Sequence, residues 1–319
     1  MDLPAPLRQA IADLLDPVPL ADLKAAGFAL SARYRAETRD GRLHLSDDLL
    51  AMAYLATRLP ATYAAVRASL SALAEARPDV SPASLLDIGA GPGTVLHAAQ
   101  DLWPGLGEAR LVEASAPIRA LGERLLACLP TVSARYEARD LRYGTPGRAD
   151  LVTATYLLDE LSPGEQGALV DSLWQACGEA LLLVEPGTPA GWRRILAARD
   201  RLLRAGASIL APCPHALACP LAAPDWCHFA ERLPRSRLHR LAKEADVPFE
   251  DEKFVYLAAA RRPGEPPAAR VLAPPRAGSG KVQLKLCRSD GRCGERLVTR
   301  REGEAFRAAR RAEWGDGFA

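Results

Sequence analysis

The chain has little of several features that a protein of 319 residues commonly carries. Its apolar runs are short, and even Ala180–Val184 falls far below the roughly 18 residues that a membrane-spanning helix needs, so we expect no membrane segment. Lysine is scarce, with five residues against 36 arginines. This ratio is typical of a high-GC genome and does not indicate a function. The N-terminus has no charged stretch followed by an apolar block, so no secretory signal is predicted and the cytoplasm is the expected compartment.

The overall composition is that of an ordinary globular protein. With 49% hydrophobic and 25% charged residues, it excludes a wholly disordered chain and a fibrous one. The length predicts two domains, or one large domain with an appendage. Seven cysteines in a reducing compartment are not expected to form a disulfide framework. The net charge of +2 is unevenly spread, because residues 270–319 hold twelve basic and six acidic residues and so carry +6.

Short apolar segments alternate with helical ones through the middle of the chain, which predicts an α/β fold with a parallel sheet and helices on both faces. Residues 1–80 are expected to form a helical N-terminal region. Residues 263–319 are expected to form a linker and a small basic C-terminal piece with a β-hairpin and a helix. Between them lies one domain, residues 81–262, whose expected strands are Ser84–Ile88, Arg110–Glu113, Thr131–Tyr136, Ala149–Thr155, Ala180–Val184 and Phe254–Ala260.

A glycine-rich loop follows the first expected strand. It reads Leu-Asp-Ile-Gly-Ala-Gly-Pro-Gly-Thr, in which Gly89, Gly91 and Gly93 allow a tight turn and a close approach of a ligand to the backbone. Such a loop suits either a dinucleotide or S-adenosylmethionine. Asp87 precedes the glycines, where a carboxylate can reach the methionine ammonium group, and Glu113 ends the second strand, where a carboxylate can accept both ribose hydroxyls. These two carboxylates favour S-adenosylmethionine.

Over residues 84–262 these features resemble the class I S-adenosylmethionine-dependent methyltransferases. The resemblance implies a Rossmann-like sheet, with Asp140 after the third strand expected to meet the adenine amino group. The fourth strand ends without the Asn/Asp-Pro-Pro-Tyr string of amino-group methylation and without the Pro-Cys string of pyrimidine methylation. Tyr156, Asp159 and Glu160 are the candidates for catalysis, although a Leu-Asp-Glu-Leu segment is also an ordinary helix start.

A second group of reactive side chains lies in residues 211–228, a loop rich in proline, cysteine and histidine. Three cysteines and two histidines fall within sixteen residues, and thiols so clustered in a reducing compartment usually hold a metal. The spacing lacks the Cys-x2-Cys pair of a zinc ribbon and is more typical of an iron–sulfur site. A zinc site with Cys and His ligands and free cysteines are the alternatives. The cysteines of this loop are Cys213, Cys219 and Cys227.

A four-thiolate cluster needs one more ligand, and the loop supplies none. Cys287 and Cys293, in the C-terminal piece, are the two candidates, and either would tie that piece to the central domain. Cys128 and Cys177 lie on expected helices and are interpreted as ordinary buried residues.

Basic side chains concentrate directly after the cysteine loop. Residues 232–243 contain five basic and no acidic side chains, which together with the basic C-terminal piece indicates a polyanion partner. If that partner is RNA, as the family resemblance described next implies, these side chains are expected to contact its phosphates. The alternative is a solvated arginine-rich face. Few aromatic side chains accompany them, so sequence-specific binding of single strands is not expected. The five residues are Arg232, Arg235, Arg237, Arg240 and Lys243.

Several strings together resemble the small-ribosomal-subunit methyltransferase-like family, which includes mitochondrial assembly factors of the small ribosomal subunit and their bacterial relatives. The resemblance spans nearly the whole chain. The strings are Cys213-Pro-His-x3-Cys219-Pro-Leu-x4-Trp226-Cys227-His228-Phe229, Ala53-Tyr-Leu-Ala-Thr-Arg58-Leu-Pro60, Val184-Glu-Pro-Gly-Thr-Pro189 and Ala309-Arg-Arg-x2-Trp314-Gly-Asp316.

The resemblance implies a class I fold that binds S-adenosylmethionine, a [4Fe–4S] cluster, and association with small-subunit ribosomal RNA. By the family pattern the fourth cluster ligand falls on Cys287. The expected function is that of a methyltransferase-like protein acting on that RNA or on assembly of the subunit. The alternative is an assembly factor that uses cofactor and cluster structurally and transfers no methyl group. A monomer is expected.

Overall fold

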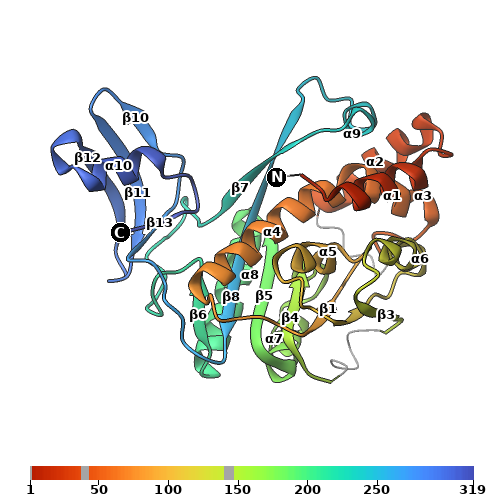
Figure 1. Cartoon of the computed structure of the whole chain (residues 1–319), viewed down its shortest axis with the longest axis horizontal. Helices are drawn as coiled ribbons and strands as arrows, with labels where there is room; N and C mark the ends of the chain where they lie inside the picture. The colour runs from red at the N-terminus through yellow and green to blue at the C-terminus, as the bar shows by residue number, and fades with distance from the viewer. Residues whose placement is uncertain (1, 37–42, 140–146) are drawn as a thin grey trace.

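The computed structural model of the chain describes residues 2–36, 43–139 and 147–319. Helices come first, a large mixed sheet follows, and a second, smaller sheet lies at the C-terminal end (Figure 1). The N-terminal helices are α1 (Ala5–Leu15), α2 (Leu20–Arg35), α3 (Asp48–Thr57) and α4 (Leu59–Ala76).

The large sheet has the strand order β3-β2-β1-β4-β5-β8-β6. Strands β3 to β5 of this order run parallel, whereas β8 runs antiparallel to both β5 and β6. The predicted class I methyltransferase fold is thereby confirmed. The strands are β1 (Ser84–Ile88), β2 (Glu108–Val112), β3 (Ser133–Glu137), β4 (Ala149–Thr155), β5 (Cys177–Pro186), β6 (Ser208–Ala211) and β8 (Phe249–Ala260).

Helices cover both faces of this sheet, because alternate strand residues point to opposite sides. On one face Leu85 and Leu111 pack in a core with α4 and with α5 (Thr94–Leu102). On the other face Leu86 and Val152 pack with α7 (Pro163–Ala176) and α8 (Pro189–Arg204). A third core joins α6 (Ala116–Leu125) to α1, α2 and α3 and places the N-terminal helices next to the carboxyl ends of β1 and β2 (Figure 1).

Strand β8 is longer than its neighbours in the sheet. Its second half pairs with β5, and its first half pairs with β7 (Phe229–Pro234) as a two-stranded antiparallel ribbon. The ribbon leaves the sheet and carries α9 (Arg237–Ala242) at its tip, where α9 contacts α2 and α3 (Figure 1). The sequence indicated the second half of β8 but neither β6 nor β7, which are short and lack a clear alternation.

The C-terminal piece is a sheet of five strands on which α10 (Glu304–Arg311) packs. The predicted hairpin and terminal helix are both present. The three shorter strands were not predicted, because two or three residues carry no periodic signal. The strands are β9 (Ala269–Val271), β10 (Arg276–Gly278), β11 (Lys281–Arg288), β12 (Cys293–Thr299) and β13 (Gly317–Phe318).

The N-terminal helices break just before Pro60. Helix α3 ends at Thr57, and Pro60 lies in the first turn of α4. A proline has no N–H to donate, and the first turn of a helix needs none. Among the described helices, no single one is long and apolar enough to span a membrane; α3 and α4 meet that condition only as a pair bent by 56°.

Candidate functional site

The glycine-rich loop joins β1 to α5 at the carboxyl edge of the sheet. Gly89, Gly91 and Gly93 have φ angles of 73°, 53° and 82°, in the left-handed region that favours glycine. A Cβ atom built on Gly91 would meet nothing within 4 Å. The loop therefore turns tightly and leaves open space beside its backbone, as a ligand-binding loop requires.

The Asp87 carboxylate is buried at the end of β1. The Thr153 hydroxyl on β4 donates a hydrogen bond to its Oδ1 at 2.6 Å, whereas Oδ2 has no partner among the described residues. Burial raises the pKa of Asp87 to about 7, the bond from Thr153 opposes the shift, and the charge of Glu113 adds to it. A buried carboxylate oxygen without a partner is costly, and a bound ammonium group would satisfy it.

The Glu113 side chain follows β2 and folds back over the glycine-rich loop. Its two oxygens accept hydrogen bonds from the N–H groups of Gly91 and Ser115 at 2.9 and 2.8 Å. Burial raises the pKa of Glu113, and these two backbone bonds oppose the shift. Each carboxylate oxygen has a further lone pair, so Glu113 is held in place and can still accept hydrogen bonds from a ligand.

Five of the six predicted cofactor residues thus lie at one edge of the sheet. They are Asp87, Gly89, Gly91, Gly93 and Glu113. Asp140 lies outside the described residues. The identity of the ligand stays a prediction.

The three candidates for catalysis lie at the end of β4, next to this edge. Tyr156 has a φ of 54°, which is unusual for a residue with a side chain, and its hydroxyl donates to Glu252 Oε1 at 3.1 Å. Asp159 is buried, and the Glu160 side chain is 32% exposed. Burial raises the pKa of Glu160 to about 8, and the charge of Asp159 adds to the shift. Asp159 and Glu160 lie in a short 3₁₀ turn, since α7 begins only at Pro163.

Two residues at this place were not predicted from the sequence. Glu252 lies on β8 with its side chain 9% exposed, and Arg58 Nη2 donates to its Oε1 at 3.2 Å. Arg58 stands between α3 and α4, so this ion pair links the N-terminal helices to the sheet. Tyr156 and Arg58 share one carboxylate oxygen. In the sequence, the one feature that drew attention to either residue was the family-like string around Arg58.

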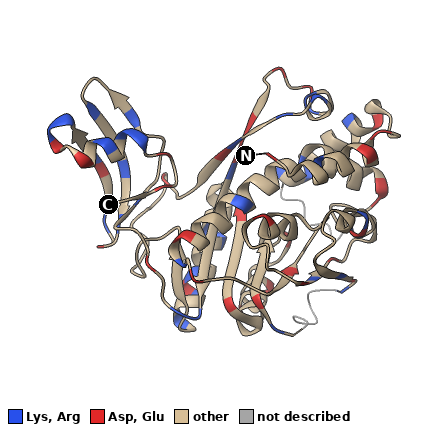
Figure 2. Cartoon of the chain, in the orientation of Figure 1, with Lys and Arg blue, Asp and Glu red and all other residues tan. Residues whose placement is uncertain are grey.

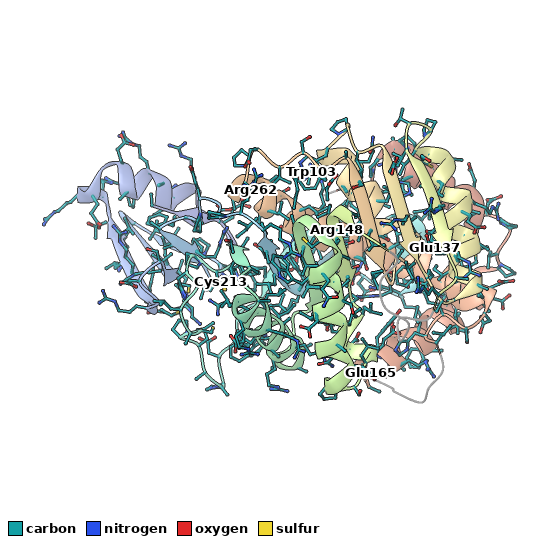
Figure 3. The ribbon with its side chains drawn as sticks, turned by 90° about the horizontal axis from the view of Figure 1, so that it is seen from below. Trp103, Glu137, Arg148, Glu165, Cys213 and Arg262 are labelled. Carbon is teal, nitrogen blue, oxygen red and sulfur yellow. The ribbon has the colours of Figure 1, made fainter. Side chains whose placement is uncertain are left out.

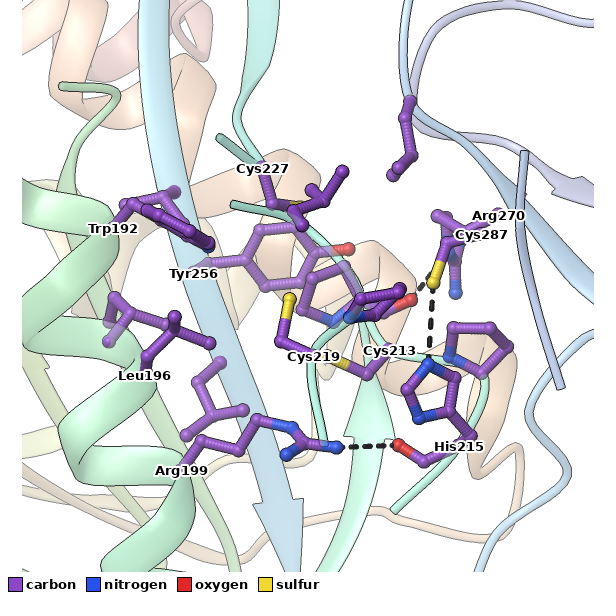
Figure 4. Close-up of a pocket in the computed structure, with 18 residues that line it drawn as sticks. Trp192, Leu196, Arg199, Cys213, His215, Cys219, Cys227, Tyr256, Arg270 and Cys287 are labelled. Carbon is purple, nitrogen blue, oxygen red and sulfur yellow. Dashed lines mark hydrogen bonds between the residues drawn. The ribbon is translucent and has the colours of Figure 1, made fainter. Parts of the chain in front are cut away.

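The cysteine loop forms one wall of a cavity beside the large sheet (Figure 4). Cys213, Cys219 and Cys227 line it from the loop, and Cys287 lines it from β11. Apolar side chains of α8 and β8 form the opposite wall. Cys293 pairs with Cys287 in the register of β11 and β12 but is not among the lining residues. The structure therefore brings together the four cysteines that the family pattern indicates.

Two arginines are the charged residues that line this cavity, and no carboxylate lines it among the residues that the structure describes. Arg199 on α8 is 1% exposed and donates to two carbonyl groups of the cysteine loop at 2.9 and 2.8 Å. Arg270 on β9 donates to the carbonyl groups of Pro212 and Gly315 at 3.0 and 2.9 Å. Arg270 thereby joins the cysteine loop to the C-terminal sheet (Figure 4).

The cavity disfavours free thiolates. Burial raises the pKa of Cys213, of Cys227 and of Cys287, the last to about 12. Neighbouring thiols add to the rise, whereas Arg199 opposes it at Cys213 and Cys287. Four ionised sulfurs in this place therefore need a positive partner, such as a metal ion or an iron–sulfur core.

The metal itself is not shown. Within residues 2–36, 43–139 and 147–319, no three His, Cys, Asp or Glu side chains are arranged so that they could hold a metal ion. The predicted [4Fe–4S] cluster and the alternative Cys/His zinc site both stay predictions. The donor chemistry of the cavity, four thiols that line one space, fits a metal group that is bound by thiolates.

Side chains from three of the family-like strings meet beside the cysteine loop. Trp226 Nε1 donates to the carbonyl group of Gly187 at 3.1 Å. The ring of Trp226 stacks on His228, and His228 meets Trp314 edge-on, each pair with centroids 4.9 Å apart. The C-terminal end of the chain is thereby packed against the loop that lines the cavity. In the view from below, Cys213 lies near the boundary between the C-terminal sheet and the rest of the molecule (Figure 3).

The basic residues 232–243 lie on β7 and α9, and carboxylates of β8 pair with three of them. Arg232 forms a two-point ion pair with Asp251 at 2.7 and 2.8 Å. Arg235 and Lys243 reach Glu250 at 3.2 and 2.5 Å. The run is therefore less basic in the fold than in the sequence, because antiparallel pairing brings acidic residues of β8 next to it.

Arg237 and Arg240 have no carboxylate partner in the described part of the chain, although Arg240 Nη2 donates to the carbonyl group of Asp246 at 3.4 Å. Both line a surface groove together with Lys24, Glu244 and Asp246. Basic side chains also gather on the C-terminal piece (Figure 2). Its exposed cations that form no ion pair among the described residues are Lys281, Arg300, Arg301, Arg310 and Arg311.

Comparison with known protein families shows to which family the chain belongs. A family model described as mitochondrial small ribosomal subunit Rsm22 matches residues 48–319. The chain belongs to the Rsm22 family. The match includes the glycine-rich loop, the cysteine loop and the C-terminal sheet.

Two curated proteins illustrate how this Rsm22-family chain relates to others. It is 30% identical to the human protein "Ribosome assembly protein METTL17, mitochondrial", over 84% of this chain and 62% of that protein. It is 27% identical to "Rsm22-cox11 tandem protein 2, mitochondrial" of Schizosaccharomyces pombe, over 89% of this chain and 45% of that protein. The chain thus spans less than two thirds of the length of either relative.

Similarity to solved structures is weaker. Magnesium protoporphyrin IX methyltransferase (ChlM) from Synechocystis, solved with bound S-adenosylmethionine, aligns at 14% identity with a TM-score of 0.41. The alignment covers 73% of this chain and 91% of that one. A similarity of this size does not support a conclusion about cofactor or substrate.

Proposed function

We propose that this Rsm22-family protein binds S-adenosylmethionine and acts on small-subunit ribosomal RNA or on assembly of the small ribosomal subunit. The family match over residues 48–319 supports the ribosomal role, and the name of the human relative is that of a ribosome assembly protein. One observation carries the cofactor part: the buried Asp87 carboxylate has an unpartnered oxygen beside the glycine-rich loop.

In this proposal, the two carboxylates at this edge of the sheet bind different parts of the cofactor. Asp87 Oδ2 accepts from the ammonium group of the cofactor, and Glu113 accepts from the ribose hydroxyls. The open space beside Gly91 admits the methionine part close to the backbone. Binding a cation also relieves the burial of negative charge at Asp87 and Glu113, which share this edge.

The end of β4 favours a second candidate function, an assembly factor that transfers no methyl group. Methyl transfer needs a nucleophile in line with the sulfonium carbon, and often a base to take its proton. The Tyr156 hydroxyl donates a hydrogen bond to Glu252. Burial raises the pKa of Tyr156 well above its usual value, so this phenol stays protonated. Glu252 is in turn paired with Arg58. Neither group is set up as a general base.

The cysteine cavity supports a [4Fe–4S] cluster in this proposal. Four thiols from the loop and β11 supply its ligands, and Arg199 and Arg270 offset its negative charge. When bound, such a cluster supplies a rigid link between the loop and the C-terminal sheet, and a one-electron couple. A zinc site remains the alternative, since His215 Nε2 lies 3.4 Å from Cys287 Sγ.

Contacts to RNA are assigned to the cations without carboxylate partners. Arg237 and Arg240 on α9 and Arg310 and Arg311 on α10 form no ion pair among the described residues, and we assign the phosphate contacts to them. Arginine suits this task because its planar group can donate two hydrogen bonds to one phosphate.

Mass spectrometry of small-subunit RNA nucleosides separates the two candidates. Cells with the gene, without it, and with an Asp87→Asn variant are compared. A methylated nucleoside that disappears in both altered strains supports methyl transfer. An unchanged nucleoside profile together with fewer mature small subunits supports the assembly factor. Unchanged nucleosides and unchanged subunit levels would contradict the proposal.

A further inference from the structure

Two buried side chains of the cysteine cavity each carry a nitrogen atom that forms no hydrogen bond of good geometry with the described residues. Arg199 Nε and His215 Nδ1 are both buried and unpaired, and both side chains line the cavity. Arg199 is 1% exposed and His215 is 9% exposed, so water does not supply the missing partner readily. Proteins rarely leave such groups unsatisfied, and an exception calls for an explanation such as an absent ligand.

The two side chains are held in place by other contacts. Arg199 is fixed by the two loop carbonyl groups that accept from its Nη2, and the exposed Asp200 lies 3.8 Å from its Nη1. His215 is fixed by the contact of its Nε2 with Cys287 Sγ at 3.4 Å. Cys213 and Cys219 lie between Arg199 and His215 (Figure 4). The unpaired nitrogens thus belong to the same wall as the sulfurs.

We propose that Arg199 and His215 donate N–H hydrogen bonds to sulfur atoms of the cluster and so raise its reduction potential. The inference rests on the proposed function, because it takes a [4Fe–4S] cluster as the occupant of the cavity. It adds a role for two residues that are not ligands.

The physical reason is the charge of the group. With four thiolates, an oxidised [4Fe–4S] cluster carries a net charge of minus two, and one electron from an external one-electron reductant makes it minus three. Hydrogen-bond donors and a buried guanidinium cation stabilise the more negative state more strongly. The reduced form of the cluster is therefore stabilised more than the oxidised form, and the reduction potential rises. A sulfur atom of the cluster also satisfies the unpaired Nε of Arg199. His215 donates through Nε2, which already faces Cys287 Sγ, and its neutral ring then carries no proton at Nδ1.

The experiment is a redox titration of the full chain, purified without air and followed by electron paramagnetic resonance. The variants are Arg199→Lys, which keeps the charge and loses Nε, and His215→Phe, which keeps a ring and loses both nitrogens. Arg261→Lys is the matched control, because Arg261 also donates to backbone carbonyl groups, at 3.0 Å to Cys177, but lies outside the cavity lining. Iron and sulfide are measured in every sample.

We expect each variant to keep its iron and to titrate at a lower potential, while the control titrates as the wild type does. A tenfold change in the ratio of reduced to oxidised protein corresponds to about 59 mV for a one-electron couple, and we expect a shift of about that size for each variant. Unchanged potentials would overturn the inference, as would a wild-type couple that cannot be reached. Loss of iron from both variants would also overturn the inference, because the two residues would then be needed to bind the cluster rather than to set its reduction potential. Wild-type protein without iron would instead refute the cluster in the proposed function.

Discussion

Asp87 is close to half-protonated at neutral pH in the free protein, because burial raises its pKa to about 7. An ammonium group pairs only with the ionised carboxylate, so binding below that pH must expel a proton. We expect the affinity for S-adenosylmethionine to fall about tenfold for each pH unit below about 7. Isothermal titration calorimetry in buffers of different ionisation enthalpy measures both the affinity and the released proton.

Two variants sharpen this test. Asp87→Asn should bind weakly at every pH, with no dependence on pH in that range, whereas Asp101→Asn on the surface should behave as the wild type does. Equal wild-type affinity at about pH 5.5 and at about pH 8 would remove Asp87 from the cofactor site.

The same carboxylate makes the free protein less stable at high pH. Its pKa is raised on folding from the usual value near 4, so the folded state holds the proton more tightly than the unfolded state. Stability is therefore lost as the pH rises from about 4 to about 7. Asp87→Asn should raise the free energy of unfolding at pH 8 by about 1.4 kcal/mol for each unit of the pKa shift, and hardly change it at pH 4. Denaturant unfolding without cofactor measures this, and an equal loss of stability at both pH values would contradict it.

Individual site residues could be predicted where the signal is local. Asp87 and Glu113 stand at fixed places next to a glycine string, so the sequence indicated both, and the structure places them together. Glu252 and Arg58 could not be predicted, because they lie 194 positions apart and meet only when the N-terminal helices pack on the sheet. No motif links them.

At the level of elements, the pairing of β7 with β8 determines which basic residues of 232–243 have a carboxylate partner and which have none. Arg237 and Arg240 on α9 have no carboxylate partner among the described residues, whereas Arg232 is paired with Asp251. Replacing Arg237 and Arg240 with alanine should flatten the slope of log affinity for RNA against log salt by about 1.5, since each phosphate contact contributes about 0.7–0.9.

Arg232→Ala is the matched control on the same ribbon and should change that slope little. Filter binding of wild type and both variants to one RNA across a salt series measures the slopes. Identical slopes for the wild type and the double variant would show that α9 does not contact phosphate.

Alternation of strands and helices was enough to predict the parallel part of the large sheet and the helices on both its faces, because each element carries its own periodic signal. The antiparallel direction of β8 was not predicted. The pairing of β7 with β8 was not predictable, since it brings together residues about twenty positions apart that share no pattern. That pairing is also why three of the five basic residues in 232–243, a run without an acidic residue, lie beside carboxylates of β8 in the fold.

At the level of the whole molecule, the cysteine cavity lies where the large sheet meets the C-terminal sheet. Cys287 comes from β11, and the other three cysteines come from the loop before β7. Cys287→Ser should therefore loosen the C-terminal sheet, and we expect faster hydrogen exchange in residues 262–299. Cys128→Ser, far from the cavity lining, should leave exchange unchanged. Equal exchange in the wild type and in Cys287→Ser would show that Arg270 and Trp314 hold the two parts together without a cluster.

The sequence alone left Cys287 and Cys293 as equal candidates, and the family pattern chose between them. The structure explains the choice: the two residues face each other across β11 and β12, but Cys287 lines the cavity. The expectations of a monomer and of a cytoplasmic compartment stay predictions.

We propose that this chain binds the small ribosomal subunit through cations without a carboxylate partner, above all Arg237 and Arg240. Sucrose-gradient sedimentation of cell extracts, with the protein detected in each fraction, tests this proposal. We expect wild-type protein to sediment with small-subunit particles, and Arg237→Ala with Arg240→Ala to move it toward the top of the gradient. Wild-type protein found at the top of the gradient or with the large subunit would refute the proposed role.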